Sequence, residues 1–561
     1  MTIKIKYISG LDKAISSGSF EDYNEIDHLT GFPGERISFQ LLIDKRADEI
    51  TGDDYPLLII PKISGDLSEY ATVRAVRNVP STVNLRGRAD ADYISLKPAL
   101  LPDLLSPLSH GKMCGVTPNA LTSLWIELDI PEDISKRGIS ILTVKLSEHT
   151  NRPSDQQTEL EKSISIEIID AKIPEQKIKF TQWFHADCLS DYYGVEKWSD
   201  RHFCIIENFA KCAVKNGINM IYTPLLTPPL DNESDNRDIQ LADITVTEGK
   251  YSFSWGKLDK WIDVMDRVGV KYFEIGHLFT QGGAKNATKA MGTVDGRYER
   301  LFPADTPSND PEYVKFLRTL LTSFISHMKA RGDDSRCTFH ISDEPPIEAL
   351  ETYLAAKAGI ADLIESYDVM DALSDYDFYE KGIVKTPVVR MNHLDPFIEK
   401  KAEGIWAYNC CAPAVGYSNR FIAMTLTRNR SIALMLYKYD FKGFLHWGFN
   451  FYNTSGSWQH INPFLDTSSG NLFPSGDPFS VYPGDNGEPW ESMRIVSFGS
   501  GLFDMRIFML CESLYSRDEV IAALESELGG EITPATYVND SASYLRIRER
   551  IVNMIKAKLS K

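Results

Sequence analysis

Two adjacent carboxylates, Asp343 and Glu344, follow an apolar run and are the residues best suited to do chemistry. The run, residues 337–341, has the composition of a buried strand, and Pro345 and Pro346 directly after the pair cannot continue a sheet ladder. We therefore expect the carboxylates where the strand opens into a loop. Two nearby carboxylates in different surroundings acquire different pKa values, and such a pair can divide the acid–base work of glycoside hydrolysis.

The competing interpretation is an exposed acidic pair in the first turn of the next helix, where the helix dipole favours negative charge. Residues 347–365 are rich in Ala, Leu, Glu and Ile and predict that helix. However, a strand, an acidic pair, a short loop and a helix in this order are typical of the C-terminal face of a (β/α)8 barrel, where catalytic residues lie. We therefore favour a catalytic pair.

Aromatic and hydrogen-bonding residues stand at or near the ends of other predicted strands. A parallel barrel brings the C-terminal ends of its strands to one mouth, and aromatic faces can stack there on sugar rings. Each residue alone is also compatible with a buried core or rim position. Together they predict a sugar pocket lined by Trp183, His185, His277, Tyr408, Asn409, Trp447 and Asn450.

No motif indicates a metal, a cofactor or a phosphate. The histidines at positions 185, 277, 340 and 446 lack the close helical spacing of metal ligands. No phosphate loop, dinucleotide fingerprint or Gly-x-Ser-x-Gly elbow is present. We expect neither a required metal nor a cofactor.

The elements that must position the site fall into three predicted segments. Residues 1–172 contain short strands separated by turn signals, which predicts an antiparallel β-sandwich. Residues 173–515 alternate strands with helices, which predicts a (β/α)8 TIM-type barrel. Residues 516–561, rich in Glu, Ala and Leu and then in Lys and Arg, predict a short helical C-terminal tail packed on the barrel. The expected fold class is therefore multi-domain.

Seven to nine barrel strands can be placed, and eight is the number that closes a small barrel. The register of the fifth and sixth strands is open, and residues 479–483 are expected to form the last one. Residues 280–310 are expected to form a long glycine-rich loop, and loops of that length are usually functional.

Composition and net charge limit the kinds of binding partner that the protein can have. The 561 residues are 43% hydrophobic and 25% charged, as in ordinary globular proteins. The formal net charge of −18 argues against nucleic acid or an anionic membrane as partner, because both need a basic face. No apolar run approaches the roughly 20 residues of a membrane span, and no signal-peptide pattern is present, so we expect a cytoplasmic protein with reduced cysteines. The oligomeric state is not predicted.

Several motifs together resemble glycoside hydrolase family 123. The similarity runs from the predicted sandwich to about residue 515. The motifs are residues 183–185 (WFH), 340–345 (HISDEP), 406–411 (WAYNCC), 443–447 (GFLHW), 482–484 (YPG) and 491–494 (ESMR). The resemblance implies a β-sandwich followed by a (β/α)8 barrel. It also implies the activity of the family's characterised members, which are exo-acting β-N-acetylgalactosaminidases.

The resemblance further implies a retaining mechanism in which the substrate's own 2-acetamido oxygen attacks the anomeric carbon. Carried over by motif, Asp343 would orient and polarise the acetamido N–H, and Glu344 would be general acid and then general base. Members of the family often end with Gly-Ile-Glu-Asp where residues 501–504 read GLFD, which leaves the exact sugar open. Two alternatives remain: a conventional carboxylate pair acting on another sugar, and a non-catalytic carbohydrate-binding barrel.

Overall fold

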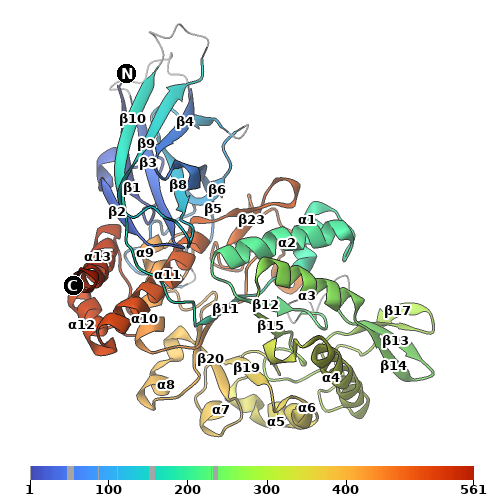
Figure 1. Cartoon of the computed structure of the whole chain (residues 1–561). Coiled ribbons are helices and arrows are strands. Elements are labelled where there is room, and N and C mark those ends of the chain that lie inside the picture. The colour runs from blue at the N-terminus through green and yellow to red at the C-terminus, as the bar shows by residue number, and fades with distance from the viewer. Residues whose placement is uncertain are drawn as a thin grey trace. The chain divides into compact units, whose positions relative to one another are not determined.

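The computed structural model describes residues 2–46, 56–85, 87–109, 112–150, 158–228, 230 and 238–560. The chain divides into two compact units, whose elements are labelled in Figure 1. The first unit comprises Met1–Gln176, Val415–Lys438 and Trp490–Lys561, and the second comprises Lys177–Ala414 and Tyr439–Pro489. Each unit therefore contains segments that are far apart in the sequence. The three domain ranges expected from the sequence remain a prediction.

Two five-stranded sheets make up the β-sandwich of the first unit, and the predicted sandwich is confirmed. The first sheet has the order β1 (Thr2–Ser9), β3 (Arg36–Arg46), β8 (Leu121–Asp129), β5 (Ala71–Ser81) and β6 (Ala99–Ser106). The second has the order β2 (His28–Gly31), β10 (Glu159–Ile168), β9 (Gly138–Glu148), β4 (Leu57–Gly65) and β7 (Cys114–Val116). The pairs are antiparallel, except that β10 and β2 run parallel.

Alternate residues of the sandwich strands form its core. Phe39 of β3 lies opposite Ile126 of β8, and both belong to one buried cluster. Val144 of β9 and Ile164 of β10 join the same cluster from the second sheet. The period of two along each strand thus directs one face of each sheet inward.

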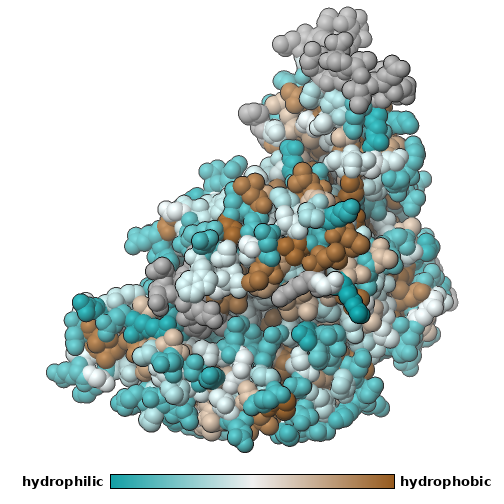
Figure 2. Space-filling model, turned by 180° about the vertical axis from the view of Figure 1, so that it is seen from behind, coloured by the Kyte–Doolittle hydropathy of each residue, from teal (hydrophilic) through white to brown (hydrophobic). Residues whose placement is uncertain are grey.

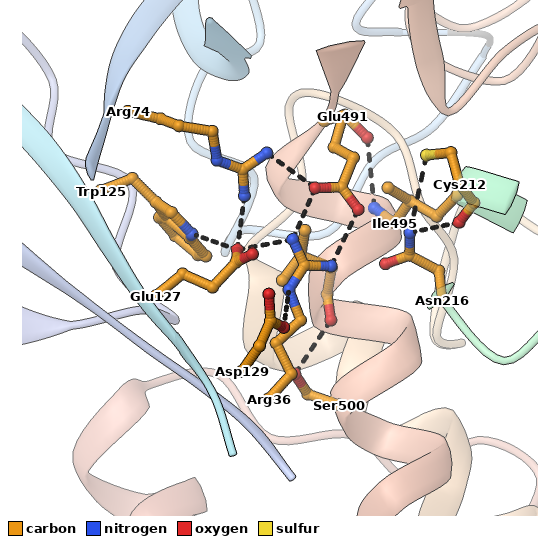
Figure 3. A network of polar contacts seen from close by, with 12 residues as sticks. Arg36, Arg74, Trp125, Glu127, Asp129, Cys212, Asn216, Glu491, Ile495 and Ser500 are labelled. Carbon is orange, nitrogen blue, oxygen red and sulfur yellow. Dashed lines mark hydrogen bonds and ion pairs between the residues drawn. The ribbon is translucent and has the colours of Figure 1, made fainter. Parts of the chain in front are cut away.

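A network of four charges lies within the first unit (Figure 3). Arg36 and Arg74 each contact the Glu127 carboxylate at 2.5 Å, and they contact Glu491 at 2.5 Å and 2.7 Å. The Trp125 indole N–H also donates to Glu127 at 3.3 Å. Because all four charges are largely buried, each needs the others as counter-ions. The network joins the first sheet to the segment that contains Glu491.

The α-helices among the described residues of the first unit are α9 (Leu426–Arg430), α10 (Ile432–Lys438), α11 (Met493–Leu514), α12 (Arg517–Leu528) and α13 (Ser541–Leu559). Arg494 of α11 forms a buried ion pair with Asp103 of β6 at 2.8 Å. Arg548 of α13 contacts Asp504 of α11 and Glu35, which precedes β3. The expected C-terminal helices are therefore present, and they share a unit with the sandwich.

Eight parallel strands close the barrel of the second unit, so the predicted TIM-type barrel is confirmed. Their order follows the chain: β11 (Lys179–Gln182), β12 (Met220–Thr223), β15 (Tyr272–Ile275), β18 (Cys337–Phe339), β19 (Asp368–Leu373), β20 (Thr386–Arg390), β21 (Trp406–Tyr408) and β22 (Gly443–His446). The register pairs Thr181 of β11 with Leu445 of β22 and so closes the ring.

Two expectations for this unit were wrong. Residues 479–483 are not a barrel strand, because β22 already pairs with β11 and closes the ring. Part of this apolar run instead forms β23 (Val481–Pro483), which lies outside the ring. Residues 280–310 are not a continuous loop, since they contain β16 (Met291–Val294) and β17 (Arg297–Arg300). These join β13 (Asp243–Thr247) and β14 (Lys250–Ser254) in a separate four-stranded sheet. An apolar pattern predicts a strand but does not identify its sheet.

The helices of the second unit are α1 (Ala186–Tyr193), α2 (Asp200–Lys215), α3 (Gly256–Val268), α4 (Pro311–Arg331), α5 (Leu350–Ala358), α6 (Ala361–Ile364), α7 (Asp377–Glu380) and α8 (Asp395–Glu399). Helix α4 illustrates how local residues set these bounds. The Asp310 side chain accepts from the backbone N–H groups of Glu312 and Tyr313, and proline occupies the first turn. Gly332, with φ of 81°, ends the helix.

Hydrophilic side chains cover much of the face of the molecule in Figure 2. Among the helices of the described residues, none is long and apolar enough to cross a bilayer. Figure 2 also shows hydrophobic groups on this face, and inside the molecule hydrophobic side chains form clusters, one of which fills the barrel. In that cluster the Trp406 ring packs directly on the backbone of Gly443, where a Cβ atom would lie 2.0 Å from the ring.

Candidate active site

The main chain before the carboxylate pair is held on both sides. Asp371 of β19, fully buried, accepts from the backbone N–H groups of Ile341 and Ser342 at 3.0 Å and 3.2 Å. On the other side, the Ser342 hydroxyl donates to the Thr280 carbonyl at 2.8 Å. The loop after β18 is therefore a preorganised support for the two carboxylates that follow it.

Asp343 is half-buried and faces the loop after β15. Its carboxylate accepts from Gln281 Nε2 at 2.9 Å, and its carbonyl accepts from the Gly282 N–H at 2.7 Å. Burial, reinforced by the like charge of Glu344, raises the pKa of Asp343 to about 8. Both effects favour the protonated form of Asp343.

Glu344 is exposed, and its backbone has φ of 43°, in the left-handed region that a non-glycine residue rarely adopts. Its N–H donates to the Ala372 carbonyl of β19 at 2.9 Å. The Tyr408 hydroxyl, from the end of β21, donates to its carboxylate. Burial and the charge of Glu344 raise the pKa of Tyr408, so the phenol keeps its proton. The two carboxylates therefore occupy different surroundings.

A buried cation lies beneath the pair. The His340 ring is fully buried, with Nε2 2.9 Å from Glu274 Oε1 and Nδ1 3.4 Å from Asp371 Oδ1. Burial lowers the pKa of His340, but the hydrogen bonds and charges of these two carboxylates outweigh it and raise the pKa to about 9. Its positive charge in turn favours ionisation of Asp343. This triad connects three neighbouring strands below the mouth.

His277 stacks on the His340 ring, with 4.4 Å between centroids, and meets Trp183 edge-on at 5.2 Å. Burial, and then the His340 charge, hold the pKa of His277 well below its usual range, so the ring is neutral. Neither ring nitrogen has a hydrogen-bond partner among the described residues, although both are buried. Buried polar atoms are normally paired, so a ligand or water is the expected partner of His277.

Trp183 and Trp447 occupy different environments. Trp183 is 3% exposed, belongs to the apolar cluster inside the barrel and donates its indole N–H to Glu274 at 2.7 Å. Trp447 is half-buried, and its N–H donates to Asp477 at 3.1 Å. Trp447 also packs on Phe473, 5.0 Å away. Of the two, Trp447 is the better placed to offer a ring face to a sugar.

Three other expected site residues are buried and bonded within the protein. The Asn450 side chain exchanges two hydrogen bonds with the His185 backbone, at 2.9 Å and 3.0 Å. The His185 ring contacts the Trp447 carbonyl at 3.0 Å. Asn409 contacts Met391 Sδ at 3.9 Å. These residues support the strand ends in the structure, and their contact with substrate stays a prediction.

Sequence reasoning missed the second layer of the site. Glu274, Asp371 and Asp477 are fully buried and hold His340, Tyr353, Trp183 or Trp447. A signal for two of them was available, because Glu274 and Asp371 each stand between apolar neighbours within a strand, where a charge needs a partner. Arg390, the last residue of β20, and His393, three residues beyond it, were not singled out from the sequence either. Among the described residues, no cluster of three His, Cys, Asp or Glu could hold a metal ion.

A closed (β/α)8 barrel with a carboxylate pair at the C-terminal end of one strand defines the class of barrel enzymes that includes many glycoside hydrolases. The catalytic-domain model of glycoside hydrolase family 123 matches residues 183–511, more than half of the chain. The protein therefore belongs to glycoside hydrolase family 123, as its motifs predicted, and it acts on carbohydrate.

A family 123 glycoside hydrolase from Clostridium perfringens has a similar structure, with a TM-score of 0.76, 16% identity and 100% of each chain covered. At this identity the likeness shows the fold. A β-glucuronidase from Bifidobacterium dentium is much less similar, with a TM-score of 0.34 and 9% identity. The match covers 89% of this chain and 66% of that one. A comparison with curated protein sequences finds no match.

Proposed function

We propose that the protein is a retaining exo-glycosidase that cleaves a terminal β-linked N-acetylhexosamine, with N-acetylgalactosamine favoured. The acetamido oxygen of the substrate attacks the anomeric carbon while Glu344 gives its proton to the departing glycosidic oxygen. The resulting oxazolinium ion is then opened by a water molecule, whose proton returns to Glu344. The net reaction adds one water across one glycosidic bond and retains the β configuration.

The observation that carries this proposal is the unequal setting of the two carboxylates. Asp343 is half-buried beside the His340 cation, whereas Glu344 is exposed at the mouth and bonded to Tyr408. A group that contacts the acetamido N–H needs a fixed, partly dry position. A group that exchanges protons with a leaving oxygen and then with water needs access to both. The arrangement supports Asp343 as the contact of the acetamido group and Glu344 as the acid and base.

The raised pKa of Asp343 is compatible with these roles, because the adjacent carboxylates repel each other and one proton can serve both. Without substrate, the proton resides on the more buried Asp343. An acetamido N–H donating to Asp343 favours its ionised form. Repulsion between the two carboxylates then favours transfer of the proton to Glu344, where the general acid is needed. Substrate binding would thus place the proton on Glu344, the general acid.

The relatives support the choice of sugar. The description of the Clostridium perfringens enzyme concerns hydrolysis of glycolipid glycans. The characterised members of the family that the motifs resemble release N-acetylgalactosamine. The neutral, unpartnered His277 offers a hydrogen bond that a sugar hydroxyl can use.

A panel of nitrophenyl β-glycosides tests the proposal with wild type, Glu344→Gln and Asp343→Asn. We expect cleavage of the N-acetylgalactosaminide, and a loss of at least about a hundredfold in kcat for both variants. The loss in Glu344→Gln is expected even with a nitrophenol leaving group, because Glu344 is also the general base that activates water in the second step. Inhibition by an N-acetyl-thiazoline analogue is expected only if the acetamido group is the nucleophile. Activity on other sugars without such inhibition would instead indicate a conventional carboxylate pair. Sugar binding without any cleavage would indicate a binding protein.

A further inference from the structure

Arg390 is the last residue of β20 and points toward the barrel interior. Val388, two residues earlier, belongs to the interior cluster, and side chains alternate along a strand. In the register of β20 and β21, Arg390 lies opposite Tyr408, whose side chain is part of the same interior cluster. Arg390 therefore stands at the level of the mouth where Tyr408 meets Glu344.

Glu344 spans the end of β20. Its backbone N–H bonds to β19 through Ala372, and its carboxylate bonds to β21 through Tyr408, while β20 lies between these two strands. His393, three residues beyond Arg390, feels the charge of Glu344. The side chains that follow β20 therefore lie beside the proposed acid.

Arg390 forms no ion pair with any of the residues that the structure describes. Its Nη2 donates to His393 Nε2 at 2.5 Å, and its Nε is buried without an acceptor. By contrast, the buried Arg494 of the first unit is paired with a carboxylate. A partly buried guanidinium without a counter-ion is costly, and a ligand that brings a negative charge removes that cost.

The pair offers donors only. Because His393 Nε2 accepts from Arg390, its ring proton is on Nδ1, which can donate to a ligand. Burial, and then the Arg390 charge, lower the pKa of His393 and keep the ring neutral despite the nearby Asp375 and Glu344. The planar fork of Arg390 fits two oxygens of a carboxylate or a sulfate.

We propose that Arg390 and His393 form a subsite for an anionic substituent, a carboxylate or a sulfate ester, on the sugar of the leaving group. This inference rests on the proposed function. If Glu344 is the general acid, it contacts the glycosidic oxygen, and the side chains beside it then lie on the leaving-group side of the scissile bond. The subsite makes Arg390 a specificity-determining residue.

Three disaccharides test the subsite. All carry the same β-linked N-acetylgalactosamine on a hexose that is unsubstituted, oxidised to the 6-carboxylate or 6-O-sulfated. We expect wild-type kcat/KM to be about tenfold higher for at least one charged substrate, which identifies the anion. The ratio of kcat/KM for the charged substrate to kcat/KM for the unsubstituted one should fall to about one in Arg390→Gln. It should stay at the wild-type value in Arg297→Gln, which removes the same charge from β17.

A wild-type ratio of one, or a ratio that survives in Arg390→Gln, overturns the inference and leaves the proposed function intact. An equal loss on all three substrates in Arg390→Gln also overturns it and assigns the guanidinium to sugar hydroxyls. If wild type cleaves none of them, the proposed function fails, and a binding measurement then tests the subsite by itself. Galactose 6-sulfate and galacturonate are titrated into wild type and into Arg390→Gln. Tighter binding of one by wild type supports the subsite, and equal binding overturns it.

Discussion

The Tyr408 hydroxyl donates a hydrogen bond to the Glu344 carboxylate, from the end of β21 to the loop after β18. This bond holds a carboxylate whose own backbone is in a strained left-handed conformation. It therefore fixes the position from which Glu344 would meet the glycosidic oxygen.

Tyr408→Phe is expected to lower kcat by about tenfold to a hundredfold on natural glycosides, because a misplaced acid transfers its proton less efficiently. Nitrophenyl glycosides, which need little acid assistance, should lose less. A plot of log kcat against the pKa of the leaving group measures the difference as a steeper slope. The phenyl ring keeps the core filled, so folding should be unaffected.

Tyr298→Phe is the matched control. Tyr298 of β17 also donates to a carboxylate, that of Asp238 at 2.9 Å, but in the separate four-stranded sheet. Its removal should leave the slope unchanged. A slope equally steep in both variants would contradict a positioning role for Tyr408.

The pH–rate profile of wild type should have an alkaline limb near pH 8. Burial and the Glu344 charge raise the pKa of Asp343 to about 8, and the pair needs that proton to protonate the leaving oxygen. Activity is therefore expected to fall as the pH rises through 8, measured as kcat/KM from pH 5 to 10. An alkaline limb below pH 6 would contradict a shared proton.

Asp343→Asn should stabilise the protein at pH 8 while abolishing activity. A carboxyl whose folded pKa is raised holds a proton that the unfolded chain has lost, so its contribution to stability falls as the pH rises from about 4 to 8. After allowance for the solvent that reaches this half-buried group, we expect a gain on the order of 1 kcal/mol. Urea midpoints of both proteins at pH 5 and pH 8 measure it, and a gain no larger at pH 8 would count against the raised pKa.

His340→Gln should destabilise the barrel by about 3 kcal/mol, because it leaves the buried Glu274 and Asp371 without their cation. The pKa of His340 is raised to about 9, so its stabilising charge is fully present below the unfolded value near 6.5 and lost as the pH rises through 9. The difference between wild type and variant should therefore shrink from pH 6 to pH 9.5, as measured by urea unfolding. The exposed His28→Gln should show a difference below about 0.5 kcal/mol at both pH values.

Glu127→Gln should destabilise the sandwich unit by about 3 kcal/mol, since it leaves Arg36 and Arg74 short of one buried counter-ion. The thermal midpoint measures the loss. The exposed pair of Lys136 and Asp66 provides the control, and Asp66→Asn should cost less than about 1 kcal/mol. Equal losses would show that the buried network is no more important than a surface pair.

Local patterns were sufficient to predict the fold class and many of the elements, and to single out the carboxylate pair as a candidate site. Helix α4 begins at Pro311 and ends at Arg331, and its capping residues and its proline, which set these bounds, act within one turn. Asp343 and Glu344 could be singled out because a buried strand that ends in two acids and two prolines is unusual in itself. The family resemblance rests on the same short motifs, and the family match bears it out.

Only the tertiary structure decided which residues meet. The register of β20 and β21 brings Arg390 beside Tyr408, and the closure of β22 on β11 excludes residues 479–483 from the barrel. The tertiary structure also shows that His340, at the end of an apolar run, is a cation held by Glu274 and Asp371 from two other strands. The physical reason is that burial, pairing of charges and pKa depend on neighbours distant in the chain, whereas periodicity and capping depend on adjacent residues.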